Sequence, residues 1–166
     1  IGLGHAAYRA EDNAEAAKAY ELALHLNPRS FLVRLALARV YWRLNRLAEA
    51  AEEQLEVLRT HPRFAQAHAD YGVTLVRVGR HGDALASLLK GIELGYREAI
   101  VFNFLGNAYV ALGRTNEAIG AFEQAIRLDS AYPTAYVNLA LLYADAGARA
   151  KARQYYKKVV DDQPGL

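Results

Sequence analysis

The 166-residue sequence contains no cysteine and no methionine. Without cysteine, the chain can form neither a disulfide bond nor a thiolate metal site, and it has no thiol nucleophile. Since methionine is absent and the first residue is Ile1, we expect the chain to be a segment of a longer protein. A targeting or catalytic part of that protein can then lie outside this sequence.

The chain also lacks a large charge excess and a long apolar run. Its 20 basic and 18 acidic residues leave a formal net charge of +2, which argues against strong non-specific binding to nucleic acid. Arg, Glu or Asn interrupts the longest apolar runs well before the ~18 residues that a membrane span needs, and no signal-peptide pattern opens the chain. The sequence predicts a soluble chain without a membrane span and does not decide between cytoplasm and periplasm.

The serine and histidine residues show no catalytic arrangement. None of the serines at positions 30, 87 and 130 lies in a Gly-x-Ser-x-Gly elbow. The histidines at positions 5, 25, 61, 68 and 81 include no i, i+4 pair, so a zinc site would need ligands that converge from distant segments. We therefore expect that this segment is not an enzyme and that it has no catalytic residue, metal or cofactor.

A 34-residue period runs through the whole chain without an insertion or deletion. In the segment 102–132, an aromatic residue is followed by Leu-Gly, Tyr, Ala and Phe at fixed spacings. Steps of 34 residues from Gly106 reach Gly4, Ala38, Gly72 and Ala140, which are all small. The same steps from Ala118 reach Ala16, Ala50, Ala84 and Ala152. Small residues at these positions predict two helices that approach closely in every repeat.

This pattern resembles the tetratricopeptide repeat family, whose repeat has 34 residues. The resemblance extends from end to end and implies an all-α fold, a right-handed superhelical α-solenoid of antiparallel helix pairs. It implies one domain over 1–166 with repeats 1–30, 31–64, 65–98, 99–132 and 133–166, the first of them truncated at its start. The first helices are expected at about 1–10, 31–44, 65–78, 99–112 and 133–146, and the second helices at about 14–26, 48–60, 82–94, 116–128 and 150–162.

The residues at the helix ends fit this assignment. Gly79, Gly113, Gly147 and Asn45 can adopt the left-handed conformation that ends a helix, whereas Glu11 fits it poorly. A negative charge in the first turn of a helix is stabilised by the helix dipole. Four of the expected second helices have an acidic residue there, namely Glu15, Glu49, Asp83 and Glu117. Lys151 departs from that pattern.

Tyrosines at the repeat period are expected to pack in the core or between repeats. They are Tyr20, Tyr41, Tyr109, Tyr143 and Tyr156. No polar capping helix follows the last repeat, which would leave Tyr155, Val159 and Val160 partly bare. We expect more chain to follow in the full protein, and the alternative is that the ends stack on other molecules.

The resemblance also implies a binding surface, because first helices line the concave groove of the family and hold peptides there. The strongest candidates by position are Tyr8, Arg9, Arg39, Trp42, Arg43, Asp70, Arg77, Asn103, Asn107 and Asn138. Further positions that the resemblance places in the groove are His5, Leu35, Gln66, Val73, Val76, Ile100, Val110, Thr134, Leu141 and Asp145.

These residue types have distinct chemical uses. Guanidinium groups can grip carboxylates in a bidentate manner, and the candidate arginines lie in the first three repeats, so the expected partner is an acidic protein segment. Trp42 and Tyr8 could hold an apolar side chain between them, since tryptophan is enriched at binding hot spots. The asparagine amides suit the backbone of an extended peptide.

A structural role for the same residues is the competing interpretation. Arg39 can pair with Asp70, the asparagines can tie neighbouring helices together, and Trp42 can pack against the first repeat. The two-carboxylate clamp that some family members use for chaperone tails is absent, because apolar residues occupy its positions in every frame.

Three functional hypotheses follow. The leading one is an interaction scaffold that binds a peptide or partner protein in the groove. The second is a structural module that associates with itself end to end. The third is the substrate-recruiting arm of a larger enzyme or of a secretion or export machine.

Overall fold

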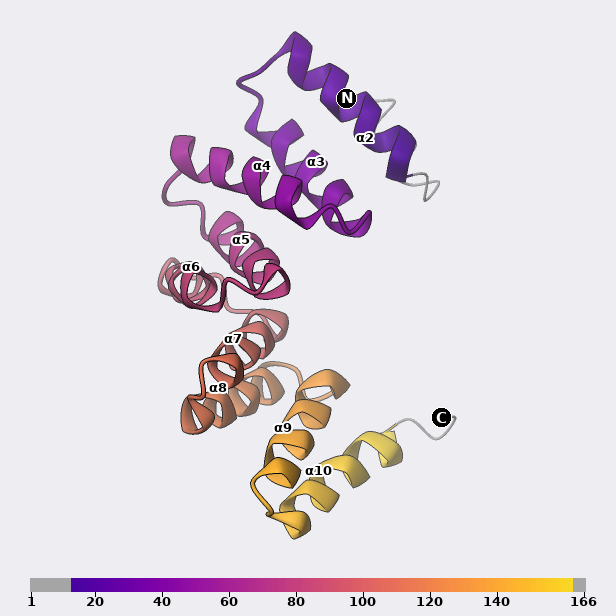
Figure 1. Cartoon of the computed structure of the whole chain (residues 1–166), viewed down its shortest axis with the longest axis vertical. Coiled ribbons are helices and arrows are strands. Elements are labelled where there is room, and N and C mark those ends of the chain that lie inside the picture. The colour runs from indigo at the N-terminus through magenta and orange to yellow at the C-terminus, as the bar shows by residue number, and fades with distance from the viewer. Residues whose placement is uncertain (1–12, 163–166) are drawn as a thin grey trace. The chain divides into compact units, whose positions relative to one another are not determined.

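The computed structural model describes residues 13–162, and within that range it contains nine α-helices and no strand (Figure 1). The chain divides into two compact units, Ile1–Tyr96 and Arg97–Leu166, called unit 1 and unit 2 below. The division falls close to the boundary predicted between the third and fourth repeats.

Unit 1 contains the described helices α2 (Asn13–Leu26), α3 (Phe31–Arg43), α4 (Leu47–Thr60), α5 (Ala65–Val78) and α6 (His81–Glu93). Each of these helices packs against the next one along the chain. Unit 2 contains α7 (Ala99–Ala111), α8 (Thr115–Leu128), α9 (Pro133–Asp145) and α10 (Arg149–Asp162), which pack in the same sequential manner. The predicted boundaries of these helices are confirmed to within one residue, and the expected helix at 1–10 lies outside the described residues.

The turns inside the repeats share one hydrogen-bonding pattern. A residue with positive φ follows the first helix at Asn45 (59°), Gly79 (87°), Gly113 (72°) and Gly147 (74°). At each turn this residue and the next donate their backbone N–H groups to carbonyl oxygens in the last turn of the helix, as Gly79 and Arg80 do to Val76 and Leu75 at 3.1 and 2.9 Å. The predicted left-handed helix ends are thus confirmed, whereas Glu11 lies outside the described residues.

A close contact between the two helices of a repeat explains the small residues at the 34-residue period. A Cβ atom added to Gly72 would lie 2.6 Å from Cγ of Leu88, and one added to Gly106 would lie 2.4 Å from Cε1 of Phe122. Leu88 and Phe122 are almost completely buried. Each glycine therefore makes room for a large side chain of the second helix, as the sequence predicts.

In the last repeat, the residues at this contact between the two helices differ. Ala140 occupies the position of Gly106 and is fully buried, while Tyr156 occupies the position of Phe122. Tyr156 is 39% exposed, whereas Phe122 is almost completely buried. The expected packing role of Tyr156 is therefore wrong, whereas Tyr20 and Tyr41 are buried as predicted. Val160 is 65% exposed.

A cation lies over an aromatic ring at three of the four turns described above. The guanidinium carbon of Arg46 lies 4.2 Å from the ring centroid of Tyr41, and that of Arg114 lies 4.7 Å from the ring centroid of Tyr109. Both arginines also donate Nε hydrogen bonds of 2.9 Å to the acidic residue in the first turn of the following helix, Glu49 or Glu117. Hydrogen bonding from Arg46 lowers the pKa of Glu49. The first-turn carboxylates therefore fix an arginine over the turn and also face the helix dipole.

The departure of Lys151 from the acidic pattern has a structural reason. Ala148 stands where Arg46 and Arg114 stand in earlier repeats. Lys151 supplies the missing cation, with its Nζ atom 4.9 Å from the ring centroid of Tyr143. The last repeat thus has the same cation–π contact, but its cation comes from a residue three positions later in the repeat.

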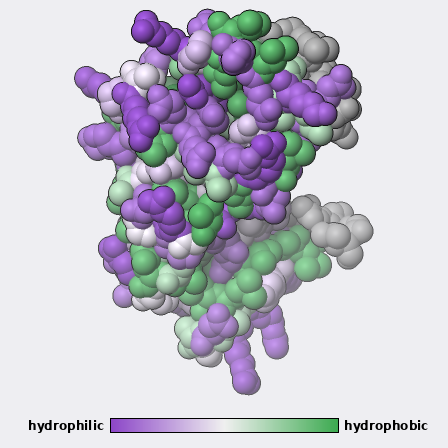
Figure 2. Space-filling model, turned by 45° about the horizontal axis from the view of Figure 1, so that its top comes forward, coloured by the Kyte–Doolittle hydropathy of each residue, from purple (hydrophilic) through white to green (hydrophobic). Residues whose placement is uncertain are grey.

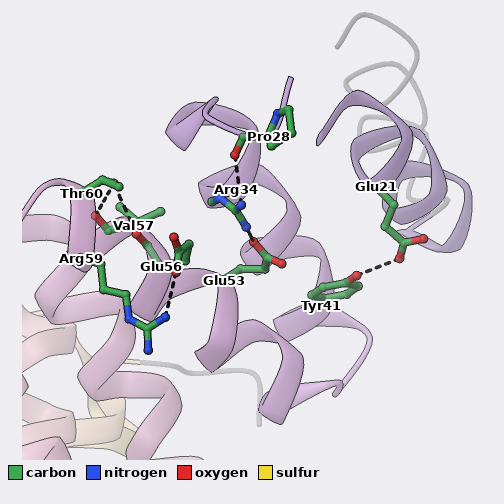
Figure 3. A network of polar contacts seen from close by, with 9 residues as sticks. All are labelled: Glu21, Pro28, Arg34, Tyr41, Glu53, Glu56, Val57, Arg59 and Thr60. Carbon is green, nitrogen blue, oxygen red and sulfur yellow. Dashed lines mark hydrogen bonds and ion pairs between the residues drawn. The ribbon is translucent and has the colours of Figure 1, made fainter. Parts of the chain in front are cut away.

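Side-chain hydrogen bonds link successive helices of unit 1 (Figure 3). The Tyr41 hydroxyl on α3 donates to Glu21 on α2 at 2.8 Å. Arg34 on α3 donates to Glu53 on α4 at 2.6 Å and to the carbonyl oxygen of Pro28 at 3.0 Å. Burial, assisted by the Glu21 hydrogen bond, raises the pKa of Tyr41 to about 12.

We predict opposite effects for two glycine-to-alanine changes in unit 2. Gly106→Ala forces its Cβ into the Phe122 ring and should lower the free energy of unfolding by about 1–3 kcal/mol. Gly120→Ala, inside α8 with no atom within 4 Å of the added Cβ, should raise it by about 0.5–1 kcal/mol. Urea unfolding of both variants measures the difference, and a shift of both in one direction would contradict the close contact.

We also predict a loss of stability in the alkaline range. Tyrosine in an unfolded chain has a pKa of about 10, so folded Tyr41 keeps its proton to higher pH, to about 12. Between these values the folded state binds more protons, and the free energy of unfolding falls as the pH rises, by up to about 2 kcal/mol.

The matched variant is Tyr41→Phe, which cannot titrate at this position. The pKa values of Tyr132 and Tyr155 are also raised by burial, and both residues remain in the two proteins. Urea unfolding below pH 10 and at about pH 11 should show a steeper decline for the natural sequence than for Tyr41→Phe. Parallel declines would show that the Tyr41 environment does not favour the neutral hydroxyl.

Candidate functional site

The described candidate residues lie on the first helices of both units. In unit 1, α3 carries Arg39, Trp42 and Arg43, and α5 carries Asp70 and Arg77. In unit 2, α7 carries Asn103 and Asn107, and α9 carries Asn138. Tyr8 and Arg9 lie outside the described residues, as does His5. We call these surfaces of α3 with α5 and of α7 with α9 the first-helix faces of unit 1 and unit 2.

Trp42 is part of the packing of unit 1. Its half-buried ring packs against the core cluster that contains Tyr20 of α2 and Leu37 of α3. Arg77 of α5 covers the ring, with its guanidinium carbon 4.7 Å from the centroid, and donates to the Oδ1 atom of Asn45 at 3.0 Å. Trp42 therefore packs against the first repeat, as the structural alternative predicts, is covered by Arg77 of α5, and is not an open clamp.

Arg39 and Asp70 face each other across the same surface. The Arg39 Nη2 atom lies 3.9 Å from a carboxylate oxygen of Asp70, and their side chains are 53% and 30% exposed. An exposed pair at this distance contributes about 0–1 kcal/mol. The ion pair considered from the sequence is thus present, but it holds the Arg39 guanidinium only weakly.

The three asparagines of unit 2 are bonded to one another. The Asn138 side-chain nitrogen donates to Oδ1 of Asn103 at 2.8 Å and to Oδ1 of Asn107 at 3.2 Å. Asn103 is only 2% exposed. Both N–H groups of Asn138 are therefore used inside the protein, and the structural alternative, in which these amides tie adjacent helices together, is confirmed.

The two first-helix faces use equivalent positions for different chemistry. Asp70 follows Arg39 by 31 residues, and Asn138 follows Asn107 by the same interval. Each pair links the first helices of consecutive repeats. The link is an ion pair at the surface of unit 1 and a largely covered amide cluster in unit 2.

Some of the remaining groove candidates are packed in the core, and others are exposed. Leu35 and Val76 pack against the second core cluster of unit 1, so the structure gives them a packing role. On unit 2, apolar groove candidates are exposed, namely Ile100 (44%), Val110 (44%) and Leu141 (49%). On the side of the molecule shown in Figure 2, hydrophobic residues reach the surface in separate patches among hydrophilic ones. The first-helix face is thus rich in arginine in unit 1 and has exposed apolar side chains in unit 2.

The inter-repeat loops form hollows that the sequence interpretation overlooked. In unit 1 a hollow of about 490 Å³ is lined by Phe31, His61, Pro62, Arg63 and Phe64. In unit 2 a hollow of about 370 Å³ is lined by Arg97, Glu98, Ala99, Ile100, Leu128, Asp129 and Tyr132. The available signal was the recurrence of arginine at positions 29, 63 and 97, which follows the repeat period.

The part of the chain that the structure describes has neither a metal-binding cluster nor a membrane-spanning helix. Within it, no three His, Asp or Glu side chains gather in a way that could hold a metal ion. No described helix has both the length and the apolar character needed to cross a bilayer.

Sequence profiles of one repeat family match the chain in three places. A profile described as "Tetratricopeptide repeat" matches residues 1–59, another of the same description matches 133–164, and one described as "TPR repeat" matches 106–147.

Two curated relatives share part of their length with the chain. The Type IV pilus assembly protein PilF of Pseudomonas aeruginosa is 30% identical over 159 residues, which cover 94% of this chain and 62% of that protein. The mouse Tetratricopeptide repeat protein 17 is 37% identical over 68 residues, or 41% of this chain and 6% of that protein. The chain thus spans less than two thirds of both relatives.

Solved structures share the fold over nearly the whole chain. The crystal structure of MamA has a TM-score of 0.87 at 24% identity and covers 99% of this chain and 96% of that one. YrrB, described as a TPR protein with an unusual peptide-binding site, has a TM-score of 0.79 at 22% identity, with coverages of 99% and 85%. The expected all-α solenoid of helix pairs is thereby confirmed.

We predict that Asn138 contributes to stability. Asn138→Ala removes the donor from Oδ1 of buried Asn103 and should lower the free energy of unfolding by about 1–3 kcal/mol. Asn116→Ala, at an exposed position of α8, is the control, with an expected change within about 0.5 kcal/mol. Thermal and urea unfolding measure both, and equal stabilities would show that the amide cluster does not tie α7 to α9.

Proposed function

Since this chain is a member of the tetratricopeptide repeat family, we propose that it is a protein-interaction scaffold whose first-helix face in unit 1 binds an acidic peptide segment. The observation that carries the proposal is the charge of that face. Arg39, Arg43 and Arg77 bring three guanidinium groups to α3 and α5, and Asp70 brings one carboxylate.

The arginines of this face differ in how firmly they are held. Arg77 is fixed over the Trp42 ring and by its bond to Asn45, so its guanidinium is pre-oriented at the surface. Arg39 is held by a single long contact to Asp70, and a partner carboxylate can replace Asp70 at small cost. A pre-oriented cation beside an exchangeable one suits a ligand with two carboxylates.

The first-helix face of unit 2, taken by itself, offers a different kind of contact to a partner. The exposed side chains of Ile100, Val110 and Leu141 offer apolar contact area. The covered amide cluster beside them leaves little of Asn103 to a ligand. We therefore assign the asparagines to positioning the helices and the apolar side chains to contact with a partner.

The similarity to PilF favours a second candidate function, a role in the assembly of a larger protein machine. This relative is named a pilus assembly protein and matches 94% of the chain. The two candidates are compatible, because an assembly factor also needs a surface that binds a partner protein.

We predict that two charge changes act in opposite directions on the binding of an acidic peptide. The probe is a fluorescein-labelled peptide of Glu and Leu residues, compared with the peptide in which Gln replaces every Glu. Arg39→Gln should weaken binding of the Glu peptide about threefold to tenfold, because one carboxylate partner is lost. Asp70→Asn should strengthen it, because the competing carboxylate is removed.

The measurement is fluorescence anisotropy at low and high salt, since screening weakens exposed pairs. Neither change should alter binding of the Gln peptide. If Arg39→Gln and Asp70→Asn shift the affinity for the Glu peptide in the same direction, the first-helix face of unit 1 is not the acidic-peptide site.

A further inference from the structure

We propose that the inter-repeat loop edge of unit 1 is a second interaction site, which takes an aromatic side chain next to a carboxylate of a partner peptide. The site is the hollow of about 490 Å³ lined by Phe31, His61, Pro62, Arg63 and Phe64, called the loop-edge hollow below. It lies at the start of α3 and between α4 and α5, and none of its residues belongs to the first-helix candidates.

Three aromatic rings form the walls of the loop-edge hollow. The ring centroids of Phe31 and His61 are 4.1 Å apart with an interplanar angle of 36°, and those of Phe31 and Phe64 are 6.3 Å apart and nearly perpendicular, at 87°. The Phe31–Phe64 pair has the edge-to-face geometry that aromatic rings prefer, and a partner ring can pack against these walls in the same way. The volume falls in the range of about 300–1,000 Å³ that is usual for ligand pockets.

The loop that forms the hollow is braced from inside the protein. His68 of α5 bonds through Nε2 to the carbonyl oxygen of Pro62 at 2.9 Å, and the Phe64 backbone N–H donates to the carbonyl oxygen of His61 at 3.1 Å. The Nδ1 atom of His61 lies 2.9 Å from the Thr60 hydroxyl, which orients the imidazole. A ligand therefore meets a preformed loop and need not order it on binding.

The charge around the hollow selects the partner. Arg63 is exposed, and no acidic side chain of the described residues forms an ion pair with it. The two inter-repeat loops of unit 1, residues 27–30 and 61–64, contain Arg29 and Arg63 and no acidic residue. An apolar hollow with a cation at its rim is complementary to an aromatic side chain that has a carboxylate beside it.

Unit 2 contains a matched comparison within the same molecule. Its hollow occupies the equivalent loop two repeats further on, where Ala99 replaces Phe31, Asp129 replaces His61 and Tyr132 replaces Phe64. Its lining has two carboxylates, those of Glu98 and Asp129, against the single guanidinium of Arg97, so its charge is less favourable to an acidic ligand than that of the loop-edge hollow. The two hollows share a place in the repeat, and only the one in unit 1 has the chemistry for this partner.

The experiment uses the whole chain and a fluorescein-labelled acidic peptide, Glu-Glu-Trp-Glu-Glu, together with the peptide in which Gly replaces Trp. By fluorescence anisotropy, Arg63→Gln should weaken binding of the Trp peptide about threefold to tenfold. Arg97→Gln, which changes the arginine in the lining of the unit 2 hollow, should change it less than about twofold. Phe31→Leu keeps an apolar wall without the ring and should remove most of the advantage of the Trp peptide over the Gly peptide.

Three results would overturn the proposal. The first is an unchanged affinity in Arg63→Gln together with a loss in Arg39→Gln, which would place the peptide on the first-helix face instead. The second is tighter binding of single-stranded polyuridylate than of the Trp peptide, lost in Arg63→Gln, which would make the hollow a site for nucleic-acid bases. The third is a light-scattering mass that rises with protein concentration and stays monomeric in Arg63→Gln, which would make a second copy of the chain the occupant.

Discussion

The close contact between the two helices of each repeat is the constraint on which the rest of this structure depends. At Gly106 the backbone of α7 approaches the Phe122 ring so closely that even a methyl group would overlap it, and Gly72 and Leu88 repeat the contact in unit 1. This approach commits one face of each first helix to its partner helix. The opposite side of the first helix is left to link repeats and to meet ligands.

Many side chains that seem available to a ligand in the sequence are used in the structure to link one repeat to the next. Trp42 is covered by Arg77, Asp70 faces Arg39, and Asn138 spends both its N–H groups on Asn103 and Asn107. The strength of these links differs with burial: the Arg39 pair is exposed, whereas Asn103 is almost completely covered. Exposed polar links can exchange partners at little cost, and buried ones cannot. For this reason we place ligand binding on the arginines of unit 1 and not on the asparagines of unit 2.

The repeats also share features at their turns and loops. At the turns, different residues can supply the cation that lies over the aromatic ring. Lys151 replaces the arginine of earlier repeats over the Tyr143 ring, although it stands three residues later than Arg46 and Arg114 do. At the loop edge the place in the repeat is kept while the chemistry changes: three aromatic rings and Arg63 line the hollow of unit 1, whereas two carboxylates join Arg97 and Tyr132 in the lining of unit 2. Conserved geometry with changed chemistry is how a repeat protein can present different sites along one scaffold.

The sequence by itself determined the period, the helix boundaries and the turns, because each depends on residues close together in the chain. Small residues at 34-residue intervals, glycine or asparagine after a helix, and acids in the first turn act locally and can be read in order. Only the tertiary structure decided which groove residues are tied to each other, that Tyr156 lies at the surface, and that Phe31, His61 and Phe64 line an open hollow. The groove links and the hollow depend on distances between side chains some 30 residues apart, such as Asn138 and Asn107, and a periodic pattern read along the chain does not contain those distances.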